Sequence, residues 1–217
     1  MTGILFDLEL REGKDCPSEL LPAEFLEDGI TAGLLLHLTK TIQHTARYVV
    51  LDSGFCVLLA LLALKKKGVY AGALIKKRHY WPSLVAGNAI DGHFDNKEVG
   101  AFAAVEGNHD GICYNIWAMK DASYVTKIMG TASGLLYPED RMHTRCLEGG
   151  NAASFCYTEP YYLHFKYRHL IDEHNAKRHA VPAIETSLVT TRWAMRVFQY
   201  LWATSEVNYF LGCKAFK

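Results

Sequence analysis

The sequence predicts an α/β protein whose mixed β-sheet is flanked by helices, and a β-α-β pattern is the main reason. Apolar residues Tyr48–Leu51 lead into Asp52 and a short Ser-Gly step, as a buried strand leads into a tight turn. The unbroken apolar run Val57–Leu64 then has the length of a buried helix, and Val69–Ile75 reads as a second strand. A strand, a helix and a strand in this order favour the α/β class.

The end of the expected helix carries its own signals. Three lysines, residues 65–67, suit the negative end of the helix dipole, and Gly68 suits the position just after the last helical residue. The helix is therefore expected to stop at this glycine.

Three other segments predict further strands and helices of this α/β fold. Gly3–Leu10 alternates weakly between apolar and polar residues and predicts a strand, while Ile30–Ile42 has helical spacing. Residues 83–155 are rich in glycine, with short apolar stretches such as Ile112–Trp117 between the glycines. This composition is typical of a small β-rich insertion with loops.

The C-terminal part is expected to be helical. Tyr161–His174 and Thr191–Leu211 both have helix-length apolar patterns, and Pro182 breaks the chain between them. Histidines recur there every five residues, a step of about 140° on a helix, so they do not share a face and are poor joint metal ligands. They are interpreted mostly as surface residues: His164, His169, His174 and His179.

Length and composition bound the function. A chain of 217 residues, half of them hydrophobic, fits one domain with an inserted subdomain at about residues 83–155. The six cysteines are scattered without a Cys-x-x-Cys pair, so neither a zinc knuckle nor a thioredoxin motif is supported. No signal peptide is visible, and the longest apolar run is far shorter than the roughly 20 residues of a membrane span. We expect an intracellular protein that is not secreted and has no membrane partner.

The net formal charge of zero hides two basic regions that could face phosphate groups. Residues 65–79 hold six Lys or Arg and no acid, and residues 160–217 hold eight against four acids. In the first region, Lys76, Lys77 and Arg78 precede Tyr80 and Trp81. Basic residues beside aromatic ones can follow a nucleic-acid backbone and stack on bases, but a strand end anchored by Trp81 explains them equally well.

Asp52 is the only charged residue where the first strand of the β-α-β unit meets its helix. Ligands bind at the carboxyl ends of strands in open α/β sheets, so this carboxylate could hold a metal. It could also simply cap the helix, which the local sequence slightly favours. Apolar-apolar-Asp-Ser-Gly also resembles an aspartic protease motif, but that fold needs β-structure on both sides and a second copy of the motif, which the chain lacks.

Several pieces of the chain, taken in order, resemble the catalytic domain of piggyBac-type DDE transposases and of the proteins derived from these transposable elements. No single piece is specific, but their order and spacing together are. The pieces are Val49–Phe55, Gly68–Arg78 with Pro82, Phe94–Val99, Tyr167–Asn175, Arg192-Trp193 and Glu206–Asn208.

The resemblance implies an RNase H-like fold and metal-assisted phosphodiester cleavage with strand transfer. It implies that Asp52 and Asp172 are catalytic carboxylates that bind Mg²⁺, with Asn175 as a further metal ligand where many relatives carry an acid. It also implies DNA as the partner and the nucleus as the location. The expected DNA-binding residues are Lys76, Lys77, Arg78, Lys166, Arg168, Lys177, Arg178, Arg192 and Trp193.

The departures from the family pattern shape the expected activity. Thr2–Asp7 resembles the family's second strand, so the first catalytic aspartate would lie upstream of Met1, and Asp7 lies on the wrong strand to replace it. We therefore expect an N-terminally truncated transposase-derived domain that is incomplete or inactive. The alternative is a non-catalytic DNA-binding or interaction module that keeps the fold. A homodimer is an open option.

Overall fold

The computed structural model describes residues 27–76, 87–132, 142–147, 149–180 and 184–215, which fall into two compact units. The sheet unit lies within residues 11–166 and the helical unit within residues 167–217, and each is described by itself. The predicted strand Gly3–Leu10 lies outside the described residues.

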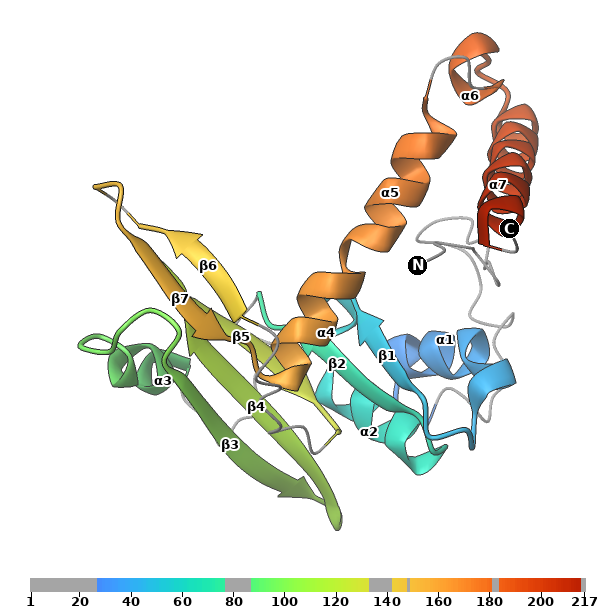
Figure 1. The fold of residues 1–217 in the computed structure, drawn as a ribbon. Coiled ribbons are helices and arrows are strands. Elements are labelled where there is room, and N and C mark those ends of the chain that lie inside the picture. Colours follow the sequence, from blue (N-terminus) through green and yellow to red (C-terminus); the bar gives the residue numbers. More distant parts are fainter. Residues whose placement is uncertain (1–26, 77–86, 133–141, 148, 181–183, 216–217) are drawn as a thin grey trace. The chain divides into compact units, whose positions relative to one another are not determined.

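A five-stranded mixed sheet forms the centre of the sheet unit, with strand order β1-β2-β5-β4-β3 (Figure 1). β1 is parallel to β2, and the pairs β2–β5, β5–β4 and β4–β3 are antiparallel. The predicted α/β class, a mixed sheet flanked by helices, is confirmed. The strands are β1 (Tyr48–Leu51), β2 (Tyr70–Leu74), β3 (Phe102–His109), β4 (Ile112–Lys120) and β5 (Val125–Gly130).

The predicted β-α-β unit is present almost residue for residue. After β1, a 3₁₀ turn η4 (Ser53–Phe55) leads into helix α2 (Leu58–Lys66), and β2 returns parallel to β1. Gly68 adopts φ 68°, the left-handed conformation that the sequence predicts just after the helix. Its N–H donates to the Lys65 carbonyl at 3.0 Å, and the next N–H donates to the Leu64 carbonyl at 3.0 Å. This glycine therefore turns the chain from α2 into β2.

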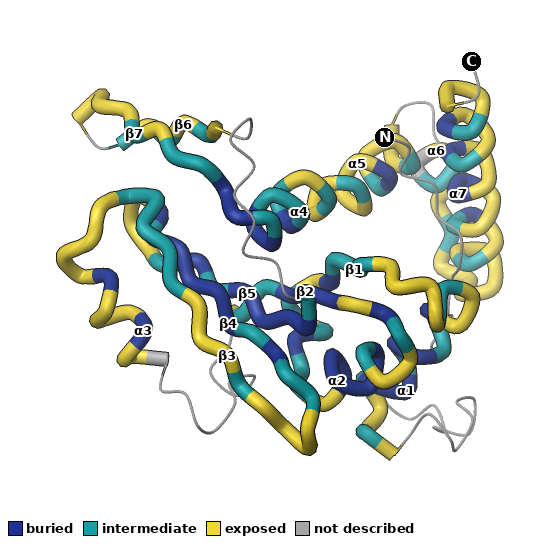
Figure 2. The backbone as a smooth tube through the Cα atoms, turned by 60° about the horizontal axis from the view of Figure 1, so that its bottom comes forward, coloured by how far each residue is buried: buried dark blue, intermediate teal, exposed yellow. Residues whose placement is uncertain are grey.

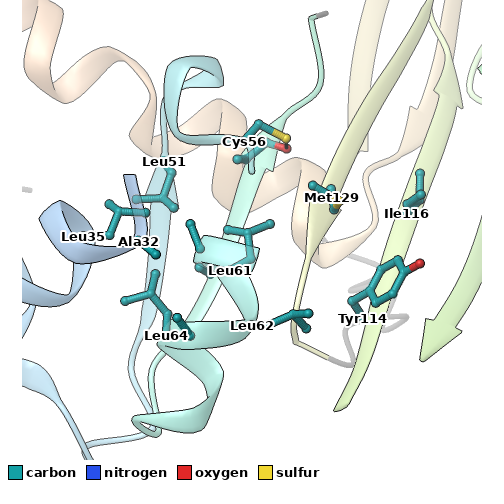
Figure 3. Packing of buried hydrophobic residues seen from close by; sticks show 14 of the residues in the cluster. Ala32, Leu35, Leu51, Cys56, Leu61, Leu62, Leu64, Tyr114, Ile116 and Met129 are labelled. Carbon is teal, nitrogen blue, oxygen red and sulfur yellow. Dashed lines mark hydrogen bonds between the residues drawn. The ribbon is translucent and has the colours of Figure 1, made fainter. Parts of the chain in front are cut away.

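One face of the sheet is covered by α2, α1 (Ile30–Leu38) and α3 (Gly87–His93). α1 continues into the short 3₁₀ turn η3 (Lys40–Ile42). Leucines and alanines of α1 and α2 meet β-strand residues such as Leu51, Ile116 and Met129 in one apolar cluster (Figure 3). Burial of the Cys56 thiol in this cluster raises its pKa to about 12.

The opposite face is covered by α4 (Glu159–Tyr167), which places Tyr161 over β4 and β5. The buried Tyr161 hydroxyl donates to the Thr126 carbonyl at 2.6 Å and lies 3.0 Å from the Trp117 carbonyl. Burial raises the pKa of Tyr161 well above its ordinary value. The side chain therefore ties α4 to the sheet by packing and by a hydrogen bond at the same time.

Two glycines face each other across β2 and β5 on the α4 side of the sheet. Gly72 pairs with Gly130, and neither has a side chain to lift its neighbours off the strands. The Tyr48 hydroxyl lies where a Cβ of Gly72 would stand, and the Trp117 ring does the same at Gly130. The glycine pair thus lets two large aromatic side chains lie flat on the sheet.

The glycine-rich region contains β-structure, as its composition predicts. Its strands β3, β4 and β5 extend the sheet that begins with β1 and β2, and β6 (Met142–Cys146) pairs with β7 (Ala152–Cys156) in a separate two-stranded sheet. A separate insertion subdomain at about 83–155 stays a prediction.

The helical unit contains α5 (His169–Arg178), α6 (Ile184–Ser187) and α7 (Trp193–Ala215), and α7 contacts both of the others. The segment expected as a helix at Tyr161–His174 is divided, because α4 ends at Tyr167 and α5 begins at His169. The interpretation of the four histidines as mostly surface residues is wrong for two of them. His164 and His174 are both buried, and His174 lies beside Asn208 of α7, a neighbour that a single-helix pattern does not reveal.

Within the described ranges, no helix combines the length and the apolar character that crossing a membrane requires.

Candidate metal centre and nucleic-acid interface

Asp52 stands exposed at the carboxyl end of β1, where the sequence places it. Its Oδ1 accepts a hydrogen bond from the Ser53 backbone N–H at 2.7 Å, so the side chain caps the η4 turn. Asp52 therefore acts as a cap, but it caps the 3₁₀ turn η4 and not the helix α2 that the sequence suggested. Helix α2 begins six residues after Asp52, at Leu58, without a side-chain cap. Oδ2 has no hydrogen-bond partner among the described residues, so one carboxylate oxygen can reach a metal while the other holds the turn.

The carboxyl ends of β1, β2 and β4 lie at the same edge of the sheet, because β4 runs parallel to both through two antiparallel steps. β2 ends at Leu74, and Lys76 follows two residues later with an exposed side chain. Leu51 pairs with Ala73 in these two parallel strands. Asp52 and Lys76, the first residue of the basic segment Lys76–Arg78, therefore follow β1 and β2 at the same edge of the sheet. Lys77 and Arg78 lie outside the described residues.

A second carboxylate at this edge, Asp121, was not singled out by sequence reasoning. It follows β4, is only 3% exposed, and pairs with the Arg145 Nε at 3.2 Å. Its Oδ1 also accepts the Ala122 N–H at 2.8 Å. Asp121 is three strand spacings from Asp52, roughly 14 Å at about 4.8 Å per spacing, and the register places it four residues further along, so the two residues are roughly 19 Å apart. That is too far for a shared metal pair, so Asp121 is an ion-paired structural residue.

Aromatic side chains stack on one another beside this ion pair. The rings of His143 and Tyr157 are stacked at 4.6 Å, and Tyr157 is stacked on Phe165 at 5.0 Å. The Arg145 guanidinium lies over Phe165 at 5.6 Å. His143 Nε2 is buried with no hydrogen-bond partner among the residues that the structure describes. Burial, together with the Arg145 charge, lowers the pKa of His143, and Asp121 opposes the shift.

This environment predicts a loss of stability in acid. At pH values between the lowered pKa of folded His143 and its ordinary value near 6.5, His143 is protonated in the unfolded protein but stays neutral in the folded one. The unfolded state therefore binds more protons, and the free energy of unfolding should fall as the pH drops below about 6.5. Urea unfolding at several pH values between neutrality and mild acid measures this fall. In His143→Gln the fall should be smaller. An equal fall in both proteins would contradict this role of His143.

The helical unit carries the other predicted metal ligands. Asp172 is exposed in the first turn of α5, and Asn175 follows it by three residues, on the same side of the helix. The Asn175 Oδ1 already accepts a hydrogen bond from Arg178 Nη2 at 3.3 Å. Because Asp52 and Asp172 belong to different units, their convergence on one metal site stays a prediction.

Arg178 is held by several groups of its own unit. Its guanidinium forms an ion pair with Glu185, lies over the Tyr200 ring at 4.3 Å, and is within 3.2 Å of His179. The side chain is only 10% exposed. It therefore joins α5, α6 and α7 and presents less free charge to a ligand than an exposed arginine does.

The other predicted DNA-binding residues divide between the units. In the sheet unit, Lys166 is exposed and lies over the Tyr162 ring at 5.0 Å. In the helical unit, Lys177 pairs with Glu173 at 3.8 Å, and Arg168, Arg192 and Trp193 are exposed. The described residues contain no group of three or more His, Cys, Asp or Glu side chains placed to hold a metal ion.

A family model described as Transposase IS4, of the DDE type, matches residues 1–210. No curated protein and no solved structure is significantly similar to the chain. The match spans nearly all of the 217 residues and ends within α7. The chain therefore belongs to the Transposase IS4 family of DDE transposases.

Proposed function

We propose that the chain is a transposase-derived domain of piggyBac type with an RNase H-like fold, related to cut-and-paste DNA transposition. The observation that carries this proposal is the exposed Asp52 at the carboxyl end of β1, beside the start of a basic segment, in a chain of the transposase family. A carboxylate at the edge of a parallel strand pair is where α/β sheets bind ligands. The proposed substrate is DNA, and the proposed location is the nucleus.

The donor chemistry of the predicted ligands fits Mg²⁺, which prefers carboxylate and carbonyl oxygens and keeps several waters. Asp52 offers Oδ2 and Asp172 offers an exposed carboxylate, and both are proposed to hold the metal. When bound, such a metal activates the attacking oxygen and stabilises the leaving oxygen of a phosphodiester. Asn175 fits less well, because the Arg178 cation that donates to its Oδ1 opposes a second cation there.

The charge of this ligand set favours weak binding of a single divalent ion. Two aspartates supply two negative charges and Asn175 supplies none, whereas two divalent cations bring four positive charges close together. The engagement of Asn175 by Arg178 favours the second candidate function, a DNA-binding module without cleavage activity.

DNA binding is expected to be weak, independent of sequence and steeply dependent on salt, because lysines and arginines release counterions from phosphates. Replacing Lys76, Lys77 and Arg78 together with alanine should flatten the plot of log affinity against log salt by about 2 to 3. Fluorescence anisotropy with a labelled duplex measures the slope. The matched control replaces Lys40, Arg47 and Lys97, which are exposed and lie outside residues 65–79 in the sheet unit, and should leave the slope nearly unchanged. An equal change in both variants would remove residues 76–78 from the interface.

A cleavage assay separates the two candidate functions. With a supercoiled plasmid that carries transposon ends of the piggyBac type, purified protein and Mg²⁺, we expect no excision, because the two carboxylates hold too little charge for two metals. Asp52→Ala is the control. Cleavage by the natural sequence that disappears in Asp52→Ala would contradict this expectation and establish the catalytic function.

A further inference from the structure

Helix α5 carries a cation that is held inside the helical unit. Figure 2 shows that exposed residues of α5 alternate with residues of lower exposure, and Arg178 is one of the less exposed residues. Its guanidinium forms an ion pair with Glu185 of α6 and lies over the Tyr200 ring of α7. Both side chains of the ion pair are largely buried. Because separating such a pair leaves a buried charge without a partner, the guanidinium is fixed in its position.

One nitrogen of this fixed cation lies beside the proposed metal ligand Asn175. Arg178 Nη2 donates to Asn175 Oδ1 at 3.3 Å. A Mg²⁺ ion that bound the same oxygen at about 2.1 Å would therefore stand no more than about 5.4 Å from Nη2. Two cations at such a distance repel each other, most strongly in partly buried surroundings. Glu185 does not remove this repulsion at Asn175, because it pairs with Nη1 while Nη2 is the nitrogen beside the amide.

We propose that Arg178 is an internal cation that takes the place of a second metal ion beside Asp172, and that it would bind a carboxylate at position 175 as firmly as it excludes a metal. This inference rests on the proposed function, because it takes Asp172 as a metal ligand. A guanidinium has five N–H donors, so Arg178 can bind Glu185 and a second carboxylate together. Restoring an acid at position 175 should therefore add an ion pair within α5 and no metal ligand.

Mg²⁺ titration calorimetry on four proteins tests the proposal: the natural sequence, Asn175→Asp, the double variant Arg178→Met with Glu185→Gln, and the triple variant that combines all three changes. The double variant removes both charges of the ion pair together, so no buried charge is left alone, and methionine keeps an apolar side chain against Tyr200. In the natural background, Asn175→Asp should change the Mg²⁺ affinity by less than about threefold. In the double variant it should raise the affinity by about tenfold or more, the typical size of an effect on metal ligation.

The control makes the same chemical change elsewhere. Asn151→Asp adds a carboxylate at an exposed position of the sheet unit and should leave the Mg²⁺ affinity unchanged in both backgrounds. Circular dichroism of every variant checks that the helices are folded before the affinities are compared.

Thermal unfolding without metal gives a second readout, which does not depend on Mg²⁺. In the natural background, Asn175→Asp should raise Tm by about 2–4 °C, a shift typical of one new favourable interaction in a protein of this size. The physical reason is that a hydrogen bond between two charged groups replaces one to a neutral amide. In the double variant the new carboxylate meets no guanidinium and lies near the negative end of the α5 dipole, so Tm should not rise.

Three results would overturn the proposal. An equal gain in Mg²⁺ affinity in both backgrounds would show that Arg178 excludes no metal. A gain in neither background would show that no second metal position exists beside Asp172. An unchanged Tm of Asn175→Asp in the natural background would show that Arg178 does not bind the carboxylate.

Asp172→Asn separates these failures from a failure of the proposed function. If it lowers the Mg²⁺ affinity of the natural sequence while the Arg178 background has no influence, the proposed function stands and only the role of Arg178 is wrong. If it leaves the affinity unchanged, Asp172 is not a metal ligand, and the inference falls together with that part of the proposed function.

Discussion

Replacing Asp52 with asparagine is expected to lower the Mg²⁺ affinity of the protein by at least about tenfold, because losing even a partner of a metal ligand typically costs 10–100-fold. Asparagine keeps an oxygen that can accept the Ser53 N–H, so the η4 turn should survive while the negative charge is lost. Isothermal titration calorimetry, or Mn²⁺ binding followed by electron paramagnetic resonance, measures the affinity.

Asp110→Asn is the matched control for this prediction. Asp110 is an exposed acid at the tip of the β3–β4 hairpin with φ 51°, a conformation that asparagine tolerates. Its replacement removes the same charge from the same unit, away from the carboxyl end of β1, and should leave the Mg²⁺ affinity unchanged. Equal affinities of the natural protein and of Asp52→Asn would show that Asp52 is only a turn cap.

Replacing Gly130 with alanine is expected to destabilise the protein by about 3 kcal/mol or more, at the upper end of the cost of overpacking. A Cβ at this position would stand 2.6 Å from the Trp117 ring and 2.7 Å from the Ala71 carbonyl oxygen. Trp117 is fully buried and the carbonyl accepts the Thr131 N–H at 2.9 Å, so neither can move away without breaking other contacts. Urea unfolding monitored by tryptophan fluorescence measures the loss.

Gly92→Ala provides the comparison. Gly92 lies in α3, and the nearest atom to an added Cβ is the Asp95 Oδ2 at 4.0 Å, so the alanine has room. Alanine favours helix over glycine by up to about 1 kcal/mol, so this variant should be as stable as the natural protein or slightly more stable. If Gly130→Ala loses no more stability than Gly92→Ala, the packing of Trp117 against β5 is looser than described.

The β-α-β unit could be predicted from sequence because its signals are local. An unbroken apolar run, a lysine cluster and Gly68 lie next to one another in the chain, and each acts on its immediate neighbours. Asp52 could be placed at a strand end for the same reason. The cap and metal interpretations stayed open there because both require the same exposed carboxylate.

The remaining features depend on residues that are distant in sequence. β5 lies between β2 and β4, an order that pairs Gly72 with Gly130 and that no local pattern encodes. The burial of His174 depends on Asn208, and the role of Asp121 depends on Arg145. From the sequence, Arg178 was expected to be a surface cation that binds DNA, but its guanidinium forms an ion pair with Glu185 and lies over the Tyr200 ring. Each of these outcomes is decided by tertiary packing.

Iron-mediated cleavage of the protein backbone tests whether Asp52 and Asp172 converge on one divalent ion, as we propose. Fe²⁺ bound in place of Mg²⁺ reduces added hydrogen peroxide to hydroxyl radicals, with ascorbate returning Fe³⁺ to Fe²⁺, and the radicals cut the chain beside the metal. The fragments are mapped by mass spectrometry. We expect cuts near residue 52 and near residue 172 together, both competed by Mg²⁺ and both lost in Asp52→Asn. Cuts near residue 172 that persist in Asp52→Asn, or cuts at one aspartate only, would contradict it.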